Sequence, residues 1–479
     1  MAERENGLNF RTLRLDRRSA APLYRQLYER IRQAILTGNL APGARLPSTR
    51  SLASQLATAR GTVELAYAML ASEGYVEGRS AAGTVVAPTL DTKRPPPRGR
   101  RPAEPHRTDA AAEMSPPLPF QMGLPALDVF PRKLWSRLVA RRARGLSSAA
   151  LAYQDAAGYR PLREAIVNYL AIARGLVCSS DQVLITAGYQ GALALVTRVL
   201  LKPGDPVWFE DPGYYRGREA LALAGASIVP VPVDAEGIDV EEGRRRAPWA
   251  RLAVVTPTHQ APLGSTLSLT RRLALLWWAA SAGAWVVEDD YDSEFRYQGR
   301  PLPALKSLDE EARVFYVGTF SKTLIPGLRL GYLVVPAAEI DRFAHAASLL
   351  MPAQALLDQM VVADFMIEGH FARHIKRMRQ LYAERRAALA QALEARLGDR
   401  LRLELQGGGM HLIAWLDERM SDVALAERGR AKGLVLHPLS AQLIEARYPP
   451  AVGVSFTNLP VENAVREVER LAALFDEMG

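Results

Sequence analysis

The chain has 479 residues, 48% hydrophobic and 23% charged, enough for about two or three packed domains. Its single cysteine, Cys178, excludes an intramolecular disulfide framework and is typical of a reducing compartment. The N-terminus lacks the apolar core of a secretory signal, and we find no apolar run of the roughly 20 residues that span a bilayer. We therefore expect a cytoplasmic protein that does not enter the membrane.

Positive charge is concentrated towards the N-terminus. The net charge of the whole chain is +9, and residues 1–87 contain 12 Arg or Lys against 7 Asp or Glu. The 360 residues after position 119 hold a surplus of only two basic side chains. This asymmetry favours a polyanion-binding N-terminal domain, and nucleic acid is the polyanion that we expect.

Residues 88–119 have the composition of a linker, with nine prolines among several arginines. Because proline fixes φ and lacks an N–H, while like charges repel, we expect this stretch to be extended and to pack little. It divides the sequence into a head of residues 1–87 and a body of residues 120–479.

The pattern of the head predicts three short helices and a hairpin. Apolar side chains at helical spacing predict a helix from Leu23 to just before Gly38. Ser48 can cap a second helix that ends at Leu56, and a third is expected over about 60–72. The β-prone runs 75–77 and 84–86 flank an expected turn over 78–83. This order is typical of a winged helix-turn-helix, a mainly helical DNA-binding fold with a β wing.

In such a motif the third helix enters the major groove by its N-terminal end, so Arg60 and Thr62 would face DNA. Exposed arginines can equally be merely solvated. The run Pro-Gly-Ala-Arg-Leu-Pro-Ser-Thr-Arg at 42–50 resembles the start of GntR-type DNA-binding domains. Glu64 departs from those relatives that carry a basic residue at this position. The resemblance implies DNA contacts from Arg45, Ser48, Arg50, Arg60 and Thr62, and from Gly83 and Thr84 in the wing.

Beyond Phe120, short β-prone runs alternate with helical ones, which predicts an α/β fold. Several runs are apolar throughout, as expected for strands buried on both faces of a largely parallel sheet. Ligands bind such sheets at the carboxyl ends of the strands. The predicted strands are 183–186, 207–209, 228–233, 252–255, 285–287, 314–317 and 330–335.

Three of these runs end in side chains that can bind ligands. The run before Glu288 ends in carboxylates, and the run before Thr319 ends in hydroxyls and Lys322. A third run leads into a helix that begins near Gly188 and could hold a phosphate at its N-terminus. The chain has only seven lysines against 53 arginines, so Lys322 stands out, although it could still merely cap a helix.

This combination suits pyridoxal phosphate. The aldehyde needs a lysine, the pyridine nitrogen needs a carboxylate, and the phosphate needs a cationic cup lined with hydroxyls. Lys322, Asp289 and Arg329 can fill these three roles. The other expected contacts are Thr319, Ser321, Gly188, Tyr189 and Gln190 near the phosphate, Tyr291 at the phenolic oxygen and Tyr214 against the ring.

The body resembles fold-type-I aminotransferases, and the whole chain resembles the MocR subfamily of GntR-type regulators. The runs 288–295 and 321–329 carry this resemblance most specifically. It implies a pyridoxal phosphate-dependent regulator whose body has a large subdomain, about 150–345, and a smaller C-terminal α/β subdomain, about 375–479. Lys322 would then bond the cofactor, Asp289 face its pyridinium and Arg329 its phosphate. The implied protein is a homodimer in which Tyr153 reaches the partner's phosphate, and Gly123 lies near the substrate-facing loop.

Two departures from the aminotransferase pattern favour a sensor. Gly453 stands where an arginine usually holds the substrate carboxylate, and Ala261 stands where an asparagine is usual. His259 or Gln260 could replace the asparagine, and Arg216 is a candidate anion clamp. We therefore expect a regulator that binds double-stranded DNA and senses a small amino compound or pyridoxal phosphate itself. The alternatives are an active aminotransferase with an accessory DNA-binding head, and an enzyme whose head binds another protein.

Three further motifs are expected to be structural. His370 and His374 share a helix face at a spacing that zinc can use, but no third ligand follows, so we expect no metal site. The glycines 407–409 lack the setting of a phosphate loop and should turn the chain into a strand at 411–416. The tryptophan pair 277–278 is expected to serve core and interface packing.

Overall fold

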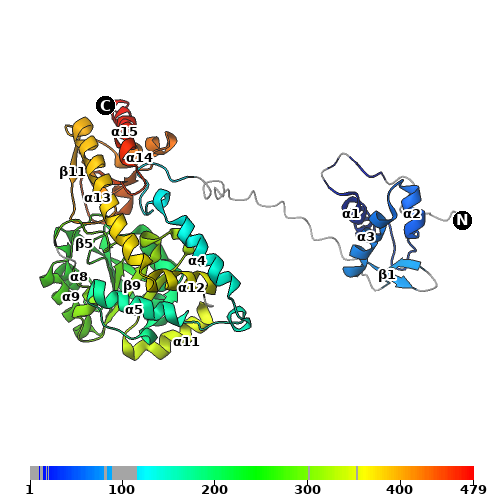
Figure 1. Cartoon of the computed structure of the whole chain (residues 1–479), viewed down its shortest axis with the longest axis horizontal. Helices are drawn as coiled ribbons and strands as arrows, with labels where there is room; N and C mark the ends of the chain where they lie inside the picture. The colour runs from blue at the N-terminus through cyan, green and yellow to red at the C-terminus, as the bar shows by residue number, and fades with distance from the viewer. Residues whose placement is uncertain are drawn as a thin grey trace. The chain divides into compact units, whose positions relative to one another are not determined.

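The computed structural model describes residues 10, 14–17, 19, 21–79, 83–88, 116–299, 302–351 and 354–478. The chain forms two compact units, Met1–Ser115 and Pro116–Gly479, shown with their element labels in Figure 1. Of the expected linker 88–119, residues 89–115 lie outside the described part.

The N-terminal unit has the expected element order. It contains α1 (Leu23–Leu36), α2 (Thr49–Gln55), α3 (Arg60–Ser72), β1 (Val76–Arg79) and β2 (Gly83–Val86). Ser48 caps α2 as predicted, because its Oγ accepts a hydrogen bond from the Ser51 N–H at 3.1 Å. The turn between the two strands is shorter than the expected 78–83, since Gly78 pairs with Thr84 in an antiparallel ladder.

One apolar core holds these helices together. Leu27 and Ile31 of α1, Leu52 of α2, and Val63 and Leu70 of α3 are buried in the same cluster. Each such side chain stabilises the fold by about 1.5–3 kcal/mol when fully buried. Because the apolar face of α3 is turned into this core, its opposite face is presented to solvent.

The C-terminal unit is built on an eight-stranded sheet of order β3-β10-β9-β8-β7-β4-β5-β6. β10 is antiparallel to both neighbours and β6 to β5, while the contiguous strands from β9 to β5 are parallel. The expectation of a largely parallel sheet is confirmed. The strands are β3 (Val183–Thr186), β4 (Pro206–Asp211), β5 (Ser227–Asp234), β6 (Gly237–Ile238), β7 (Leu252–Val255), β8 (Trp285–Asp290), β9 (Val314–Thr319) and β10 (Gly331–Val334).

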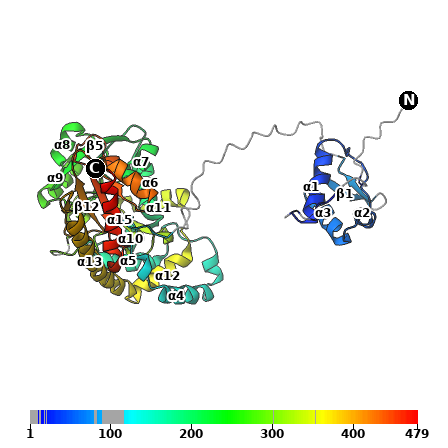
Figure 2. The same ribbon diagram turned by 90° about the horizontal axis from the view of Figure 1, so that it is seen from above.

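Helices cover both faces of this sheet. One face packs on α6 (Gly188–Leu200), α7 (Tyr215–Leu223) and α11 (Ile340–Leu350), and the other on α8 (Val240–Arg246) and α9 (Leu269–Ala282). Figure 2 shows α6 and α7 on one side of β5 and α8 and α9 on the other. Trp208 stacks on Trp278 of α9 with ring centroids 3.7 Å apart, so the second tryptophan of the 277–278 pair serves the core.

A second, four-stranded antiparallel sheet of order β11-β12-β14-β13 lies towards the C-terminus. Phe120 pairs with Ser455 of β14, so the segment after residue 116 joins this small sheet. The strands of this sheet and the helices of the same region are β11 (Leu401–Glu404), β12 (His411–Leu416), β13 (His437–Pro438), β14 (Ala451–Ser455), α13 (His370–Leu397), α14 (Asp422–Ala431) and α15 (Ala464–Asp476). Three further helices, α4 (Arg132–Arg144), α5 (Arg160–Arg174) and α12 (Leu356–Ile367), pack together beside β3.

The prediction that this strand ends at Val287 was wrong, because β8 continues through Glu288, Asp289 and Asp290. The strand can include these carboxylates because two of them, Glu288 and Asp290, have partners within the protein. Glu288 accepts the backbone N–H groups of Leu305 and Lys306 at 2.7 and 2.8 Å. Burial nevertheless raises the pKa of Glu288 to about 7. No helix in the described ranges is long and apolar enough to span a membrane.

Arg174 anchors α5 to the sheet. Its Nε lies 2.7 Å from Oδ2 of Asp290, and both side chains are almost fully buried. Its Nη1 and Nη2 donate to the Leu302 carbonyl and the Thr258 hydroxyl at 2.6 and 2.8 Å. This arginine therefore neutralises a buried carboxylate and joins three segments of the chain.

We predict that Arg174→Met lowers the unfolding free energy of the body by about 3–5 kcal/mol, because Asp290 stays buried without its cation. Chemical denaturation of the full chain measures this change. Arg342→Met is the matched control, since Arg342 pairs with Glu339 on the surface and should cost less than about 1 kcal/mol. Equal losses in the two variants would contradict the anchoring role.

Candidate functional site

The candidate cofactor residues follow strands that end at one edge of the large sheet. Gly331 of β10 pairs with both Thr186 of β3 and Thr319 of β9, so the segments leaving these two strands begin at the same level. Asp289 pairs with Val317 one strand further along. The register thus brings the segments after β3, β8 and β9 to one edge.

Lys322 lies in α10 (Phe320–Thr323), a single turn that directly follows β9. Thr319 caps this turn, because its Oγ1 accepts the Ser321 N–H at 3.1 Å. The Lys322 Nζ donates to the Gly123 carbonyl at 2.7 Å. Gly123 has φ +85°, and a Cβ there would lie 3.1 Å from Nζ, so glycine permits this close approach.

Burial lowers the pKa of the Lys322 amine below its usual value. The carboxylates of Asp292 and Asp289 oppose this shift, whereas the guanidinium groups of Arg216 and Arg329 add to it. The amine is therefore surrounded by four charged groups that bias its protonation. A lowered pKa leaves more of the neutral, nucleophilic form at a given pH.

Asp289 is a buried carboxylate to which no described residue donates a hydrogen bond. It is 6% exposed, and burial, reinforced by Asp290, raises its pKa well above the usual range. Burial therefore penalises the charged form of this carboxylate, and a nearby cation would stabilise it. A ligand that places a cationic N–H group against Asp289, as the pyridinium of pyridoxal phosphate would, supplies such a cation.

The N-terminus of α6 and Arg329 form the cationic end of the site. The first N–H groups of α6, from Gly188, Tyr189 and Gln190, have no acceptor within the helix. Arg329 has φ +49° and is exposed, and its Nη2 lies 3.4 Å from the Ala187 carbonyl just before α6. Backbone donors and a guanidinium beside a helix N-terminus suit a phosphate.

Aromatic side chains lie beside Asp289. The rings of Tyr189 and Tyr214 have centroids 5.9 Å apart. Burial first, and then the charge of Asp289, raise the pKa of the Tyr189 hydroxyl. Arg216, in the first turn of α7, donates its Nε to the Tyr215 hydroxyl at 2.9 Å and is exposed. The other N–H groups of this guanidinium form no hydrogen bond with a described residue.

The two loop residues expected near an effector have different surroundings. Nδ1 of His259 lies 3.0 Å from both the Tyr291 hydroxyl and Oδ2 of Asp292. Gln260 is buried, and its amide donates to Glu210 and to the Pro212 carbonyl at 3.1 and 2.8 Å. Its oxygen accepts the Leu263 N–H at 2.9 Å, so the protein itself uses this side chain.

The space beside Gly453, the expected position of the substrate arginine, is filled. A Cβ at Gly453 would lie 2.5 Å from the sulfur of Met122. The Met122 N–H donates to Nε2 of His437 at 3.0 Å, and His437 pairs with Gly453 across the strands. Sequence reasoning missed Met122 and His437, because nothing in the local sequence links residues more than 300 positions apart.

In the head, one of the expected DNA-contacting residues, Arg45, lies beside the wing. The Arg45 side chain lies 3.7 Å from a Cβ built at Gly83, and the Leu46 N–H donates to the Thr84 carbonyl at 2.9 Å. Arg60, at the start of α3, forms an ion pair with Glu64 at 2.7 Å. The remaining expected residues are Ser48 as the cap of α2, the exposed Arg50 in α2, and Thr62 in the first turn of α3.

Tyr153 lies apart from these contacts. Its side chain is fully exposed and makes no hydrogen bond with a described residue, and Leu151 nearby is 74% exposed. Its exposure leaves Tyr153 accessible to a partner subunit, which is where the resemblance expects it to make its contact.

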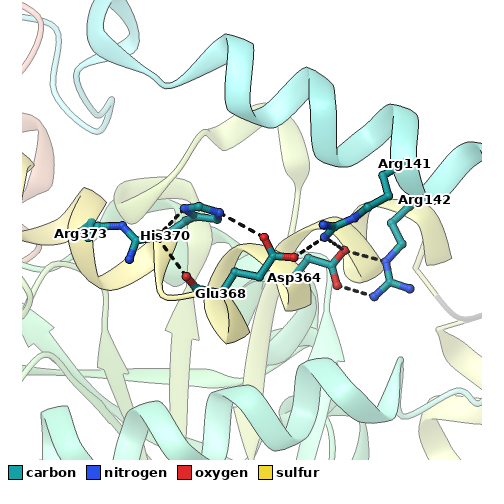
Figure 3. Close-up of polar contacts among 6 residues, drawn as sticks. All are labelled: Arg141, Arg142, Asp364, Glu368, His370 and Arg373. Atoms are coloured by element: carbon teal, nitrogen blue, oxygen red, sulfur yellow. Dashed lines mark hydrogen bonds and ion pairs between the residues drawn. The ribbon is translucent and has the colours of Figure 1, made fainter.

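The histidine pair on α13 serves packing and ion pairs. His370 bonds to Glu368 at 3.2 Å and accepts from Arg373 at 2.7 Å, as Figure 3 shows. Glu368 and Asp364 also pair with Arg141, and Asp364 with Arg142 as well, which ties α12 to α4. His374 instead packs on Phe365. Within the described residues, no group of three or more His, Cys, Asp or Glu side chains is placed to hold a metal ion.

Comparisons with known proteins match both units. Residues 23–86 match the model of bacterial regulatory proteins of the gntR family, and residues 132–456 match that of aminotransferase class I and II. A probable rhizopine catabolism regulatory protein, MocR of Rhizobium meliloti, is 39% identical over 92% of this chain and 90% of its own length. The regulator TauR of Rhodobacter capsulatus is 35% identical over 87% and 88%.

A solved structure shares the fold of the body. The α-aminoadipate aminotransferase LysN of Thermus thermophilus, crystallised with N-(5'-phosphopyridoxyl)-L-leucine, is 30% identical, with a TM-score of 0.68, over 75% of this chain and 92% of its own. The expectation of a GntR head on a fold-type-I body is thus confirmed. The chain belongs to the MocR subfamily of GntR-type transcription regulators, in which a DNA-binding domain precedes an aminotransferase-like body.

Proposed function

We propose that this protein controls transcription by sensing a small amino compound, or pyridoxal phosphate itself, in its body while its head binds double-stranded DNA. Its family makes it a DNA-binding regulator with a pyridoxal phosphate-binding body. The effector and a homodimeric assembly are the proposal. The observation that carries it is a buried amine, Lys322, beside the unpartnered carboxylate of Asp289.

The residues present fit pyridoxal phosphate. Lys322 would bond its aldehyde carbon, Asp289 would accept from its pyridinium N–H, and Arg329 with the α6 N-terminus would hold its phosphate. The bound group supplies an electron sink for an attached amine. The LysN complex contains an amino acid joined to a phosphopyridoxyl group, which supports an amino compound as the effector here.

An anionic group on the effector would find Arg216 rather than the usual arginine. Met122 fills the space beside Gly453, whereas Arg216 is exposed and close enough to Lys322 to lower the pKa of its amine. A guanidinium binds carboxylate or sulfonate oxygens with two parallel hydrogen bonds. We therefore assign the effector a primary amine at one end and an anion at the other.

Occupancy of the site could change the segment that follows the connection to the head. The Gly123 carbonyl accepts from Lys322, and the same segment is joined to the small sheet by the Ser455 N–H to Phe120 carbonyl bond at 3.0 Å. A ligand that takes up the Lys322 amine removes its bond to Gly123. Regulation requires such a contact that differs between two states of the body.

A homodimer would complete the site. The exposed Tyr153 could reach the phosphate held by a partner subunit, and two heads would bind repeated half-sites on DNA. The competing function is an active aminotransferase with an accessory head. The replacement of the substrate arginine by Gly453 disfavours rapid turnover of amino acids.

We predict that the purified protein shows a visible absorbance band with pyridoxal phosphate and that Lys322→Ala loses it. Lys376→Ala, at an exposed lysine of α13, should retain the band. A panel of amines is then added with a keto acid present. An amine that shifts the band without forming keto product supports the sensor, whereas product over many turnovers supports the aminotransferase. A band that persists in Lys322→Ala contradicts the assignment of this lysine.

We predict that Arg216→Gln raises the pH at which half of the protein captures pyridoxal phosphate covalently. Removing a nearby cation raises the pKa of Lys322, so the neutral amine that captures the aldehyde forms only at higher pH. Absorbance measured against pH gives the midpoint. The same variant should bind an anionic effector about 10- to 100-fold more weakly, since it loses a charged hydrogen bond.

Arg218→Gln is the matched control for this experiment, because Arg218 lies in the same helix and donates to the Leu443 carbonyl. It should leave both the midpoint and the effector affinity close to the wild-type values. A midpoint that falls in Arg216→Gln, or an equal rise in both variants, contradicts the predicted electrostatic effect of Arg216.

We predict that Glu64→Gln strengthens DNA binding several-fold, whereas Arg60→Gln weakens it at least about tenfold. The first change removes a negative charge from α3 and releases Arg60, and the second removes a cation from the DNA-facing end. Titration of the full chain with its own promoter DNA at several salt concentrations measures both. Glu29→Gln breaks an equivalent pair with Arg25 on α1 and should have no effect. Weaker binding by Glu64→Gln would contradict this account.

A further inference from the structure

The ring of His259 is held firmly against two glycines. This residue lies on the loop after β7 and is 7% exposed. A Cβ at Gly409 would lie 2.1 Å from its Cε1, and one at Gly264 would lie 2.9 Å from its Nε2. Both glycines have positive φ, +93° and +79°, which other residues rarely adopt. The glycine run 407–409 therefore does more than turn the chain, because it makes room for this ring.

The contacts of Nδ1 determine which atoms carry protons. The Asp292 carboxylate is 2% exposed, and Nδ1 of His259 is the one described side-chain group within hydrogen-bond distance of it. An ionised carboxylate can only accept, so Nδ1 must carry a proton. The same Nδ1–H group lies 3.0 Å from the Tyr291 hydroxyl oxygen. Tyr291 cannot donate to a protonated nitrogen, and its own O–H is therefore free to donate elsewhere.

The second ring nitrogen supports this assignment. Nε2 of His259 is buried and has no hydrogen-bond partner among the described residues. His259, Thr266, Ser293 and Arg296 line a cavity of about 60 Å³. A proton on Nε2 would therefore leave a buried donor without an acceptor. His411 packs 5.8 Å away, but its Nε2–H donates to the Pro262 carbonyl.

The group formed by His259, Tyr291 and Asp292 adjoins the cofactor site. Tyr291 follows β8 directly, two residues after Asp289. Among the charged groups near Lys322, Asp292 raises the pKa of its amine the most. Among the described residues, the charged and titratable groups that contact His259 are Asp292, Tyr291 and His411, and Arg296 lines the same cavity.

We propose that His259 is a positioning residue which, held by Asp292, directs the Tyr291 hydroxyl to donate a hydrogen bond to the phenolic oxygen of the bound cofactor. This inference rests on the cofactor site proposed above. It replaces the expected role of His259 as an effector contact. A hydrogen-bond donor at the phenolic oxygen stabilises the deprotonated form of the bound cofactor, so the cofactor loses its proton at lower pH.

The test is a double-mutant cycle read from the visible absorbance of the cofactor-loaded full chain against pH. Tyr291→Phe and His259→Phe should each raise the pH at which half of the absorbance change has occurred, the absorbance midpoint, by about one unit. This shift corresponds to about tenfold higher proton affinity of the cofactor. The double variant should show no further rise, because both changes remove the same hydrogen bond. His259→Asn should stay near the wild-type midpoint, since its side-chain N–H can still donate to Asp292.

A purely structural role would lower thermal stability without moving the midpoint. If His259→Phe does not fold, Gly409→Ala takes its place, because the added methyl group displaces the ring and should raise the midpoint in the same direction. A wild-type midpoint in the folded His259 or Gly409 variant, or additive rises in the double variant, overturns the proposal. Absence of any visible band in the wild-type protein contradicts the cofactor site instead, so the two failures are distinguishable.

Discussion

The body is organised around one buried amine. The half-buried Lys322 can keep its amine among protein groups because the Gly123 carbonyl accepts a hydrogen bond from Nζ at 2.7 Å and carboxylates lie nearby. Burying a cation is costly unless such partners are present. Two segments distant in sequence are fixed by this requirement, since the turn after β9 must meet the chain that enters the body near residue 120. The glycine at position 123 follows from that close approach.

The charges around the amine explain why the site needs both carboxylates and guanidinium groups. Asp292 and Asp289 favour the ammonium form, whereas burial, Arg216 and Arg329 favour the neutral form. Asp289 is in turn biased towards protonation by burial and by Asp290. A ligand that carries a pyridinium and a phosphate compensates both imbalances, because it places a cation at Asp289 and an anion at the arginines. The protein alone thus holds charges that a bound cofactor would balance.

Much of this arrangement could be predicted from local sequence. The strands 183–186 and 252–255 have the predicted bounds, and Ser48 caps its helix, because apolar runs and capping residues act over a few positions. The gathering of the segments after β3, β8 and β9 at one edge follows from parallel pairing, apart from the antiparallel β10. The extension of β8 to Asp290 was missed, since its carboxylates are accommodated by partners from elsewhere in the chain.

The filling of the space beside Gly453 could not be predicted, because it depends on tertiary contacts. Gly453 predicts only that an arginine is missing from its expected position, whereas Met122 and His437 occupy the space beside it. Likewise, the sequence suggests Gln260 as an effector contact, but Glu210 and three backbone groups form hydrogen bonds with its amide. Both cases share one physical reason: a buried polar or apolar group finds partners in three dimensions that spacing along the chain does not reveal.

These contacts also limit how the body can respond to a ligand. The segment from Phe120 to Gly123 is joined at one end to the small sheet and at the other to Lys322 of the large one. Closing the two parts around a ligand must therefore either keep the Lys322 bond or exchange it for a ligand contact. An effector that leaves this bond intact has no differential interaction with the two states through it and cannot shift their populations by that route. A ligand that takes up the amine, rather than one that leaves the Lys322 bond intact, is therefore best placed to change this segment.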